Sequence, residues 1–351
     1  MKKALVTGSC GLIGSESVRF LIDKGYLVYG IDNDMRKYFF GTESSTESVK
    51  YELLSLNNYH HYDIDIRDNE TIEKLFSTES FEIIIHTAAQ PSHDWASKEP
   101  FTDFTINANG TLILLENFRK YSPNASFIFT STNKVYGDRP NFLNGIIEME
   151  NRYECYDNNG ELVSINEEMS IDSCKHSIFG ASKVAADIMV QEYGKYFNLN
   201  TVCFRGGCLT GPNHKGAELH GFLSYLIKCM VTDKEYTIFG YKGKQVRDNI
   251  HSNDLVNMFW EYHLNPKKGV VYNAGGGREN SVSILEVIDY VNIKLNKKWD
   301  KFIINDNHRI GDHIWYITDL TKFKQDYPNW KLMKNVYQII DEIINSNLIN
   351  V

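Results

Sequence analysis

The sequence predicts an α/β protein built on a doubly wound parallel sheet, with a smaller α/β lobe toward the C-terminus. Two observations carry this prediction. An apolar run at residues 2–7 leads directly into a glycine-rich turn and an amphipathic stretch at residues 15–24. Apolar strand patterns then alternate with helical patterns through the first two thirds of the chain, which is typical of a parallel sheet with helices on both faces.

The glycine-rich turn has the pattern Gly-x-x-Gly-x-x-Gly between the first strand and the first helix. In that position the first glycine permits a tight turn, the second lets the backbone approach a pyrophosphate, and the third lets the helix pack on the strand. The pyrophosphate would lie at the helix N-terminus. We therefore expect a dinucleotide to contact this turn, through Gly8, Cys10, Gly11, Leu12, Ile13 and Gly14.

The second strand, residues 26–31, ends in Asp32, and Asn33 follows it. An acid about 20 residues past the glycines accepts from the ribose 2′-hydroxyl and repels a 2′-phosphate, which favours NAD over NADP. Arg36 leaves an alternative open, because an arginine can accommodate that phosphate, although a solvated surface role suits it equally well. The sequence thus predicts NAD as the cofactor, with Asp32 and Asn33 beside its ribose.

The next elements continue the alternation. We expect strands at residues 59–65, 82–86 and 126–130, and helices at residues 69–78 and 101–121. Ligands of such sheets bind at the carboxyl ends of the strands. The residues that follow the strands are therefore site candidates: Asp65, Ile66, Thr87, Ala88, Ala89, Gln90, Ser131 and Thr132.

The periodicity fails between residues 138 and 175, where charged and Asn-rich sequence takes over. A loop of that length inside a compact domain is usually functional. We expect a cofactor domain over residues 1–204 that contains this insert, and a substrate lobe over residues 205–351, with some exchange of chain between the two.

Composition excludes several classes of protein. The 351 residues are 42% hydrophobic and carry a net charge of -8, which argues against a nucleic-acid partner because no basic stripe exists to neutralise phosphates. No apolar run approaches the roughly 18 residues of a membrane span. The first residues have a strand pattern, so we expect no signal peptide. We expect a cytoplasmic protein without membrane contact. The six cysteines show no Cys-x-x-Cys spacing, so no metal site is expected.

Further motifs occur in order along the chain: Asp65-Ile66-Arg67-Asp68, His86-Thr87-Ala88-Ala89-Gln90, Asn107-x-x-Gly110-Thr111, the run from Thr130 to Gly137, and Phe179-Gly-Ala-Ser-Lys183. Together with the glycine turn they resemble the extended short-chain dehydrogenase/reductase family, which has the Rossmann fold. The resemblance covers nearly the whole chain. Within the family, residues 131–138, 151–153 and 243–248 are most similar to epimerases that act at C2 of a CDP-linked sugar.

The resemblance implies an enzyme that holds NAD tightly, moves a hydride from a sugar carbon to it and returns the hydride to the opposite face. In such enzymes a tyrosine removes the hydroxyl proton, a lysine four residues later binds the nicotinamide ribose, and a serine or threonine bonds the sugar oxygen. Thr132 matches the hydroxyl and Lys183 matches the lysine. The family pattern also implies cofactor contacts at Asn107, Thr130, Lys183 and Arg205, and sugar-nucleotide contacts at His93, Asn133, Lys134, Arg152, Tyr153 and Gly206.

Phe179 stands where the family pattern has its tyrosine, and a phenyl ring has no group to ionise or donate. Three explanations stay open: an inactivating replacement that traps substrate, a natural departure in which another group is the base, or a protein that binds nucleotide sugar without converting it. For the second, His176 would lie one helical turn from Phe179 if that segment is helical. Other candidates near in sequence or motif are Cys174, Tyr136 and Tyr153.

The last third of the chain offers two arginines beside acids, Arg247-Asp248 and Arg309-Ile-Gly-Asp312. A planar guanidinium clamps a diphosphate bidentately, so Arg247 and Arg309 are the expected phosphate ligands. Surface ion pairs with the neighbouring aspartates are the alternative.

These observations favour an NAD-dependent nucleotide-sugar epimerase acting at C2 of a CDP- or other NDP-hexose. The alternatives are a 4-epimerase, dehydratase or decarboxylase of the same family, and a nucleotide-sugar binder without turnover. Asn133-Lys134 counts against a dehydratase, in which an acid followed by a glutamate is expected just after Thr132. The family also implies a homodimer or higher homo-oligomer, formed through helices at residues 102–121 and 177–196.

Overall fold

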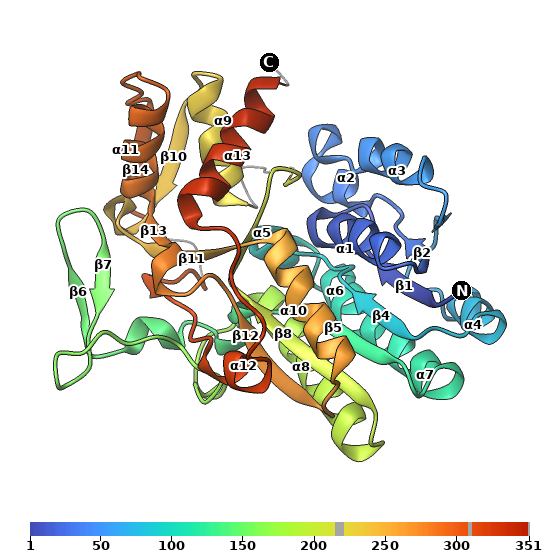
Figure 1. The fold of residues 1–351 in the computed structure, drawn as a ribbon. Helices are drawn as coiled ribbons and strands as arrows, with labels where there is room; N and C mark the ends of the chain where they lie inside the picture. The colour runs from blue at the N-terminus through green and yellow to red at the C-terminus, as the bar shows by residue number, and fades with distance from the viewer. Residues whose placement is uncertain (215–220, 308–310, 350–351) are drawn as a thin grey trace. The chain divides into compact units, whose positions relative to one another are not determined.

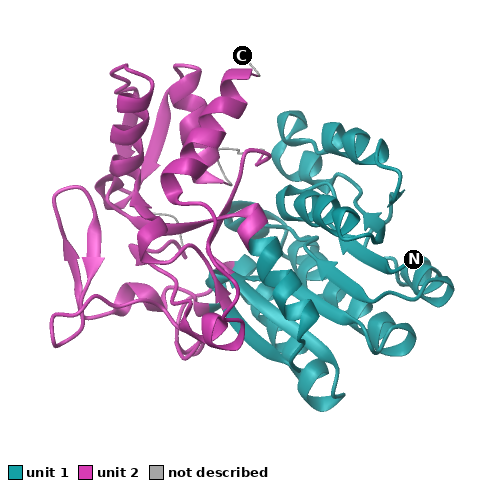
Figure 2. Cartoon of the chain, viewed as in Figure 1, with its two compact units in different colours: residues 1–135, 178–205, 255–272 teal, residues 136–177, 206–254, 273–351 magenta. Residues whose placement is uncertain are grey.

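The structure is a computed structural model that describes residues 1–214, 221–307 and 311–349. It divides into two compact units, each assembled from three separate stretches of chain (Figure 2). Unit 1 comprises residues 1–135, 178–205 and 255–272, and unit 2 comprises residues 136–177, 206–254 and 273–351. Among the described helices, none combines the length and apolar character that crossing a membrane requires.

A seven-stranded sheet forms the centre of unit 1 (Figure 1). Its order is β12-β8-β5-β4-β1-β2-β3, and β1 runs parallel to both of its neighbours, with Ala4 beside Val28 on one side and Ile83 on the other. The strand order therefore reverses at β1, which is where such sheets bind their ligands. The strands are β1 Lys3–Thr7, β2 Leu27–Ile31, β3 Tyr59–Tyr62, β4 Ile83–His86, β5 Ser126–Thr132, β8 Asn200–Gly206 and β12 Val270–Ala274.

Helices cover both faces of this sheet, because successive strand residues point to opposite sides. Leu5, Ile84 and Phe127 point to one face, where they share a core with side chains of α4 (Asn69–Thr78), α7 (Gly110–Tyr121) and α8 (Ser177–Tyr196). Ile83 and Ile85 point to the other face, beside side chains of α1 (Leu12–Asp23) and α10 (Ser252–Leu264). The prediction of a doubly wound parallel sheet is confirmed.

Two stretches of unit 1 differ from the predicted elements. The expected helix over residues 101–121 runs without interruption from Pro100 to Tyr121, but it contains a π-helical turn (Thr105–Asn109) between α6 (Pro100–Phe104) and α7. Such π-turns are often found at functional sites, and this one contains Asn107. Residues 33–58, for which no element was expected, form α2 (Met35–Phe40), a 3₁₀ turn (Thr42–Ser44) and α3 (Glu47–Leu54).

Unit 2 is built from short strands and three longer helices. The strand β11 (Val246–His251) lies at its centre and pairs with β9 (Cys208–Thr210), β13 (Ser281–Ser283) and β15 (Trp315–Tyr316). Its apolar core joins side chains of α9 (Phe222–Val231), α11 (Ile284–Lys294) and α13 (Val336–Ile349). Unit 2 also contains the β10–β14 pair (Tyr236–Phe239 and Phe302–Asn305) and α12 (Thr321–Asp326).

The insert at residues 138–175 belongs to unit 2 and contains little regular structure. A 3₁₀ turn (Arg139–Phe142) is followed by a hairpin of β6 (Ile146–Glu148) and β7 (Tyr153–Cys155). The backbone N–H of Tyr153 donates to the carbonyl of Lys244, so this hairpin is tied to the turn before β11.

Candidate active site

Two glycines of the turn at the end of β1 are required by its geometry. Gly8 has a φ of 67°, and a Cβ there would lie 2.7 Å from the backbone nitrogen of Ala88. A Cβ on Gly14 would lie 2.0 Å from the carbonyl oxygen of Gly8, so its absence lets α1 pack directly on the turn. The N-cap of α1 is Gly11, which has no side chain to occupy the first N–H groups of the helix. This cradle fits a pyrophosphate at a helix N-terminus.

Asp32 follows β2 and its carboxylate holds two backbone groups. Oδ2 accepts a hydrogen bond from the N–H of Cys10 (2.9 Å), and Oδ1 accepts one from Asp34 (2.9 Å). Each oxygen keeps a lone pair that a ribose hydroxyl can use. Burial raises the pKa of Asp32, and the two backbone donors oppose that effect. Asp32 therefore joins the end of β2 to the glycine turn.

The neighbouring polar residues are held in place by each other. Asn33 Nδ2 donates weakly to Asp65 Oδ2 (3.4 Å), and Arg67 forms an ion pair with the same carboxylate (2.6 Å). Burial alone would raise the pKa of Asp65, but Arg67 lowers it. The Arg36 guanidinium lies 5.1 Å from the centroid of the Phe40 ring, and burial lowers its pKa to about 10.

The loop after β4 is rigid. The Thr87 hydroxyl donates to the carbonyl of Thr7 (2.7 Å), and the Ala88 N–H donates to the Thr7 hydroxyl (3.3 Å). Gln90 and Asn107 exchange hydrogen bonds, from Gln90 N to Asn107 Oδ1 (3.0 Å) and from Asn107 Nδ2 to the Gln90 carbonyl (3.1 Å). The side chains of Gln90 and Asn107 are thus engaged inside unit 1, where they fix the path of residues 87–90.

Two further predicted cofactor residues are buried and contact side chains or backbone of unit 1. Ile66 is buried, and a Cβ on Gly110 would lie 2.6 Å from its Cδ1, so Ile66 packs directly on the backbone at the start of α7. Arg205 on β8 is buried and forms a bidentate pair with Asp187 on α8, at 2.8 and 3.1 Å. Sequence reasoning missed Asp187, although its position one helical turn after Lys183 places the two on the same helix face.

Sequence reasoning also missed the role of His86, the last residue of β4. Its Nδ1 lies 2.7 Å from the Thr7 hydroxyl, and its Nε2 lies 2.9 Å from the Thr111 hydroxyl. Complete burial lowers the pKa of His86 to about 3, and the charge of Lys183 adds to that effect. His86 is therefore neutral, and its two hydrogen bonds connect β1, β4 and α7.

Lys183 is buried on α8 and points at the end of β5. Its Nζ donates to the carbonyl of Thr130 (2.9 Å) and lies 4.2 Å from the centroid of the Phe129 ring. Burial lowers the pKa of Lys183 to about 8, and the Asp187 carboxylate opposes the shift. The Thr130 hydroxyl oxygen is buried with no hydrogen-bond partner among the described residues. A cation beside an orphaned hydroxyl fits the ribose hydroxyls of a dinucleotide.

Thr132, Asn133 and Lys134 lie where β5 gives way to a 3₁₀ turn (Asn133–Tyr136). The Lys134 N–H donates to the Thr132 hydroxyl (3.2 Å), which orients that oxygen, and Asn133 is buried. Thr132 therefore ends the same strand that Lys183 contacts through Thr130.

Phe179 is buried in the first turn of α8, one helical turn before Lys183. Its ring packs edge-to-face against the His93 imidazole, with centroids 5.0 Å apart. Its backbone carbonyl accepts from Ser182 (2.9 Å), whose hydroxyl oxygen also accepts from Asn107 (3.0 Å). The structure thus brings His93, Phe179, Lys183 and Asn107 together within unit 1.

The other candidate bases have different surroundings. α8 begins at Ser177, whose φ is 64°, so His176 precedes the helix and the expected helical-turn relation to Phe179 is wrong. In unit 2 the His176 Nε2 lies 3.5 Å from the Cys174 thiol. The Tyr136 hydroxyl is fully buried and donates to Asn273 Oδ1 (2.7 Å), while Tyr153 lies on β7.

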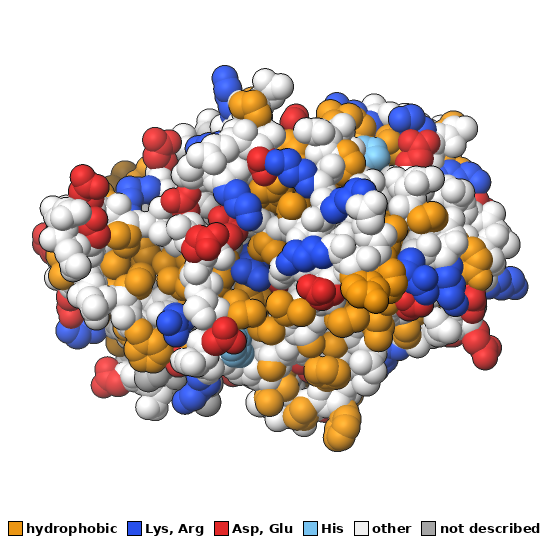
Figure 3. Space-filling view, turned by 90° about the horizontal axis from the view of Figure 1, so that it is seen from below, with side chains coloured by type: hydrophobic (Ala, Val, Ile, Leu, Met, Phe, Trp, Pro, Cys, Tyr) orange, Lys and Arg blue, Asp and Glu red, His pale blue; other side chains and the backbone are white. Residues whose placement is uncertain are grey.

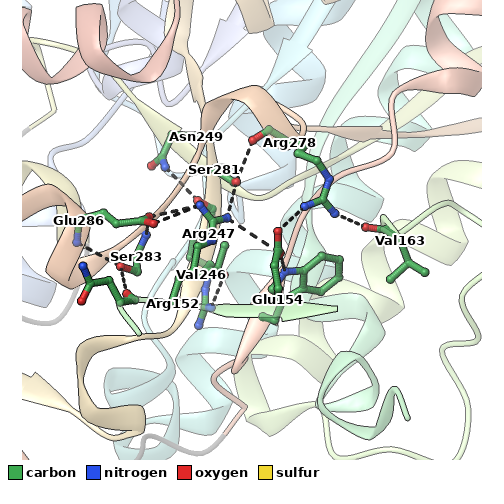
Figure 4. Close-up of polar contacts among 12 residues, drawn as sticks. Arg152, Glu154, Val163, Val246, Arg247, Asn249, Arg278, Ser281, Ser283 and Glu286 are labelled. Carbon is green, nitrogen blue, oxygen red and sulfur yellow. Dashed lines mark hydrogen bonds and ion pairs between the residues drawn. The ribbon is translucent and has the colours of Figure 1, made fainter. Parts of the chain in front are cut away.

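Unit 2 contains a cluster of arginines and carboxylates around β11 and β13 (Figure 4). Arg152 contacts Glu286 (3.3 Å) and Ser281 (2.8 Å), and Arg278 contacts Glu154 (2.6 Å). Arg247 donates to Asp312 (2.7 Å) and to the carbonyls of Val246 (2.8 Å) and His313.

Arg247 is therefore a buried side chain that forms an ion pair with Asp312. The expected alternative of a surface ion pair holds for the partner Asp312 but not for the exposure of Arg247. Its described contacts leave Nε and one N–H of Nη1 for an anion. Gly206 ends β8, where a Cβ would lie 3.1 Å from Leu209. The predicted phosphate ligand Arg309 lies outside the described residues.

The chain matches known proteins over most of its length. Residues 4–275 match the model of the NAD dependent epimerase/dehydratase family. The chain is 34% identical over 305 residues to CDP-paratose 2-epimerase of Salmonella typhi, which covers 84% of this chain and 86% of the relative. It is 25% identical over 346 residues to UDP-glucuronate 4-epimerase of Thermodesulfobacterium geofontis, covering 97% and 94%.

Solved structures share the fold. A UDP-glucuronic acid 4-epimerase of Bacillus cereus superposes with a TM-score of 0.80 at 22% identity, over 99% of this chain and 100% of the other. A UDP-glucose 4-epimerase of Thermotoga maritima superposes with a TM-score of 0.77 at 24% identity, over 99% of each chain. The family, the fold and the NAD dependence predicted from the motifs are confirmed. The chain belongs to the NAD dependent epimerase/dehydratase family.

Proposed function

We propose that this enzyme epimerises a nucleotide-activated hexose at C2, with a CDP-sugar as substrate. The similarity to a CDP-paratose 2-epimerase, at 34% identity over most of both chains, carries this proposal. Relatives that are 4-epimerases and 4,6-dehydratases are 25–30% identical, so C4 chemistry is the second candidate. Asn133-Lys134 after Thr132 argues against dehydration, because no carboxylic acid follows the strand there.

We assign the cofactor to unit 1. Bound NAD supplies a reversible hydride acceptor. The glycine turn would hold its pyrophosphate, Asp32 its adenosine ribose, and Lys183 with Thr130 its second ribose. Thr132 would donate to the reacting sugar oxygen, and the Lys183 charge would stabilise negative charge that develops there. His93, Asn133 and Lys134 from unit 1, and Arg152, Tyr153, Gly206, Arg247 and Arg309 from the rest of the chain, are the proposed sugar-nucleotide contacts.

An isotope experiment tests the reaction. We expect a CDP-hexose carrying deuterium at C2 to invert at C2 in ordinary water and to keep the deuterium, because the hydride never leaves the active site. Lys183→Met should lower turnover at least about 100-fold, whereas Lys195→Met, an exposed lysine on the same helix, should leave it unchanged. Inversion with loss of deuterium to solvent would contradict hydride transfer, and inversion at C4 would favour the second candidate.

The cofactor assignment predicts that the protein purifies with NAD bound, which is checked by denaturing it and identifying the released dinucleotide. Asp32→Ala should weaken NAD binding by about 1.5–3 kcal/mol, because a charge-assisted hydrogen bond to the ribose is lost. Asp63→Asn is the control, since it removes one exposed carboxylate charge nearby. Binding of NADP in preference to NAD by the unmodified protein would refute the role of Asp32.

The proposed diphosphate clamp predicts a selective loss of sugar-nucleotide affinity. Arg247→Lys keeps the charge but loses the planar fork, so calorimetric titration with CDP-, UDP- and GDP-sugars should show affinity weakened about 10- to 100-fold, with NAD affinity unchanged. Arg278→Lys, in the same arginine cluster, is the matched control and should bind normally. If both variants bind the sugar nucleotides with equal affinity, Arg247 is not a phosphate ligand and has only its ion pair with Asp312.

We also propose that the protein forms a homodimer through α6, α7 and α8. Apolar side chains gather in groups between charged residues on the face shown in Figure 3. Helices α7 and α8 are neighbours, since the Tyr193 hydroxyl donates to Glu116 (2.5 Å). Exposed apolar residues of these helices and their ends are Phe101, Phe104, Leu112, Ile188, Tyr196 and Phe197. A monomer rarely exposes such a group, which supports an interface there.

The dimer proposal predicts a change of mass in solution. By light scattering we expect the mass of two chains for the unmodified protein and of one chain for Leu112→Arg/Ile188→Arg, because two buried charges would oppose association. Ile293→Arg on α11, which is 79% exposed, should keep the mass of two chains. A double variant that still has the mass of two chains would exclude this face as the interface.

A further inference from the structure

The site lacks a proton-transfer group at the position where its family pattern has one. Phe179 occupies that position in the first turn of α8, and its ring is buried. The phenyl ring fills the space of a phenol but can neither take nor give a proton. An epimerase with this side chain needs another group close to the same place, because removing a hydroxyl proton accompanies the loss of hydride from the carbon.

His93 is a titratable side chain that packs on Phe179. The two rings meet edge-to-face with centroids 5.0 Å apart. His93 begins α5 (His93–Lys98), directly after the loop that follows β4. This loop lies at the carboxyl ends of the strands, where ligands of this fold bind. The side chain is half-buried, so a ligand can reach it. An imidazole also titrates in the range in which general bases work.

The backbone that carries His93 is firmly held. The Ser92 hydroxyl caps α5 by accepting from the N–H of Trp95 (3.3 Å). The Gln90 amide donates to the Ser92 carbonyl (2.8 Å) and to Asp103 (2.9 Å), and Asn107 completes the network. A proton-transfer group must be positioned within hydrogen-bond reach of its substrate, and this network supplies that rigidity.

The other histidines of the described part of unit 1 lie on other elements, and Lys183 is bonded to a backbone carbonyl. Both ring nitrogens of His86 bond to threonines, and its burial keeps it neutral. Lys183 donates to the Thr130 carbonyl. His60 and His61 lie on the edge strand β3, and His263 lies on α10 beside Tyr26. His93 is thus the imidazole of the described part of unit 1 that lies at Phe179.

We propose that His93 transfers the proton that a tyrosine at position 179 would otherwise transfer; this rests on the proposed epimerase function. In the first half-reaction an imidazole nitrogen takes the proton of the sugar hydroxyl, and the hydroxyl carbon loses its hydrogen with both electrons to the nicotinamide ring of NAD. The O–H electron pair becomes the second bond of the carbonyl. In the second half-reaction the hydride returns to the opposite face, and the imidazolium returns its proton to the oxygen.

A contact measurement and a kinetic measurement test this role together. In protein labelled with ¹⁵N-histidine and loaded with NAD, a saturating CDP-hexose should shift the His93 imidazole signals, assigned by their absence from His93→Gln or His93→Asn, and leave those of His60 in place. His93→Gln should lower kcat about 100-fold or more while KM changes less than threefold. His60→Gln, a substitution on an exposed histidine, should keep full activity.

Three results would overturn the inference. The first is a folded His93→Gln variant that keeps more than a tenth of kcat. The second is a His93 signal that does not move when the sugar nucleotide binds. The third is a Phe179→Tyr variant that gains 100-fold or more, since this would mark the phenylalanine as an inactivating replacement. If the unmodified protein inverts no sugar in a panel of CDP-, UDP- and GDP-hexoses, the proposed function itself fails, a result distinct from the three above.

Discussion

The candidate active site depends on one buried carboxylate, Asp187. It accepts from Ser131 on β5 (2.5 Å) and forms a bidentate pair with Arg205 on β8. Burial lowers the pKa of Lys183, one helical turn earlier on α8, and the charge of Asp187 opposes that shift. A buried charge that loses its partner costs about 3–5 kcal/mol, so α8 and the two strands are locked in one register. The orientation of Lys183 toward the end of β5 follows from this register.

Prediction from sequence succeeded where a residue type is required by local geometry. Gly8 and Gly14 are required by a left-handed φ and by the contact of α1 with the turn, and both requirements are visible in spacing alone. Prediction failed where the partner is distant in sequence. The Thr7–His86–Thr111 hydrogen bonds and the Asp187–Arg205 pair have no local sequence pattern. The π-turn inside the helix at residues 105–109 has none either. His176 was misplaced because a left-handed Ser177 begins the helix after it.

Phe179 supplies aromatic packing at its position but no group for proton transfer. Its ring packs against His93, its backbone carbonyl accepts from Ser182, and the Ser182 hydroxyl accepts from Asn107. Lys183, one helical turn later, is buried and donates to the Thr130 carbonyl. A protein that had lost its reaction would have no physical need for a lysine buried at this cost, because desolvation disfavours the ammonium. The retained lysine therefore favours a site that still handles charge on a bound ligand.

Arg247 of unit 2 is likewise a buried charge. Arg247 is buried and paired with Asp312, and the loss of one partner would leave an uncompensated charge. Such a pair adds little stability compared with apolar residues of the same volume, so stability alone does not explain it. A diphosphate would find a guanidinium already oriented by Asp312 and by two backbone carbonyls, with N–H groups left to donate. Because the side chain is ordered before the ligand arrives, binding would forfeit little rotamer entropy.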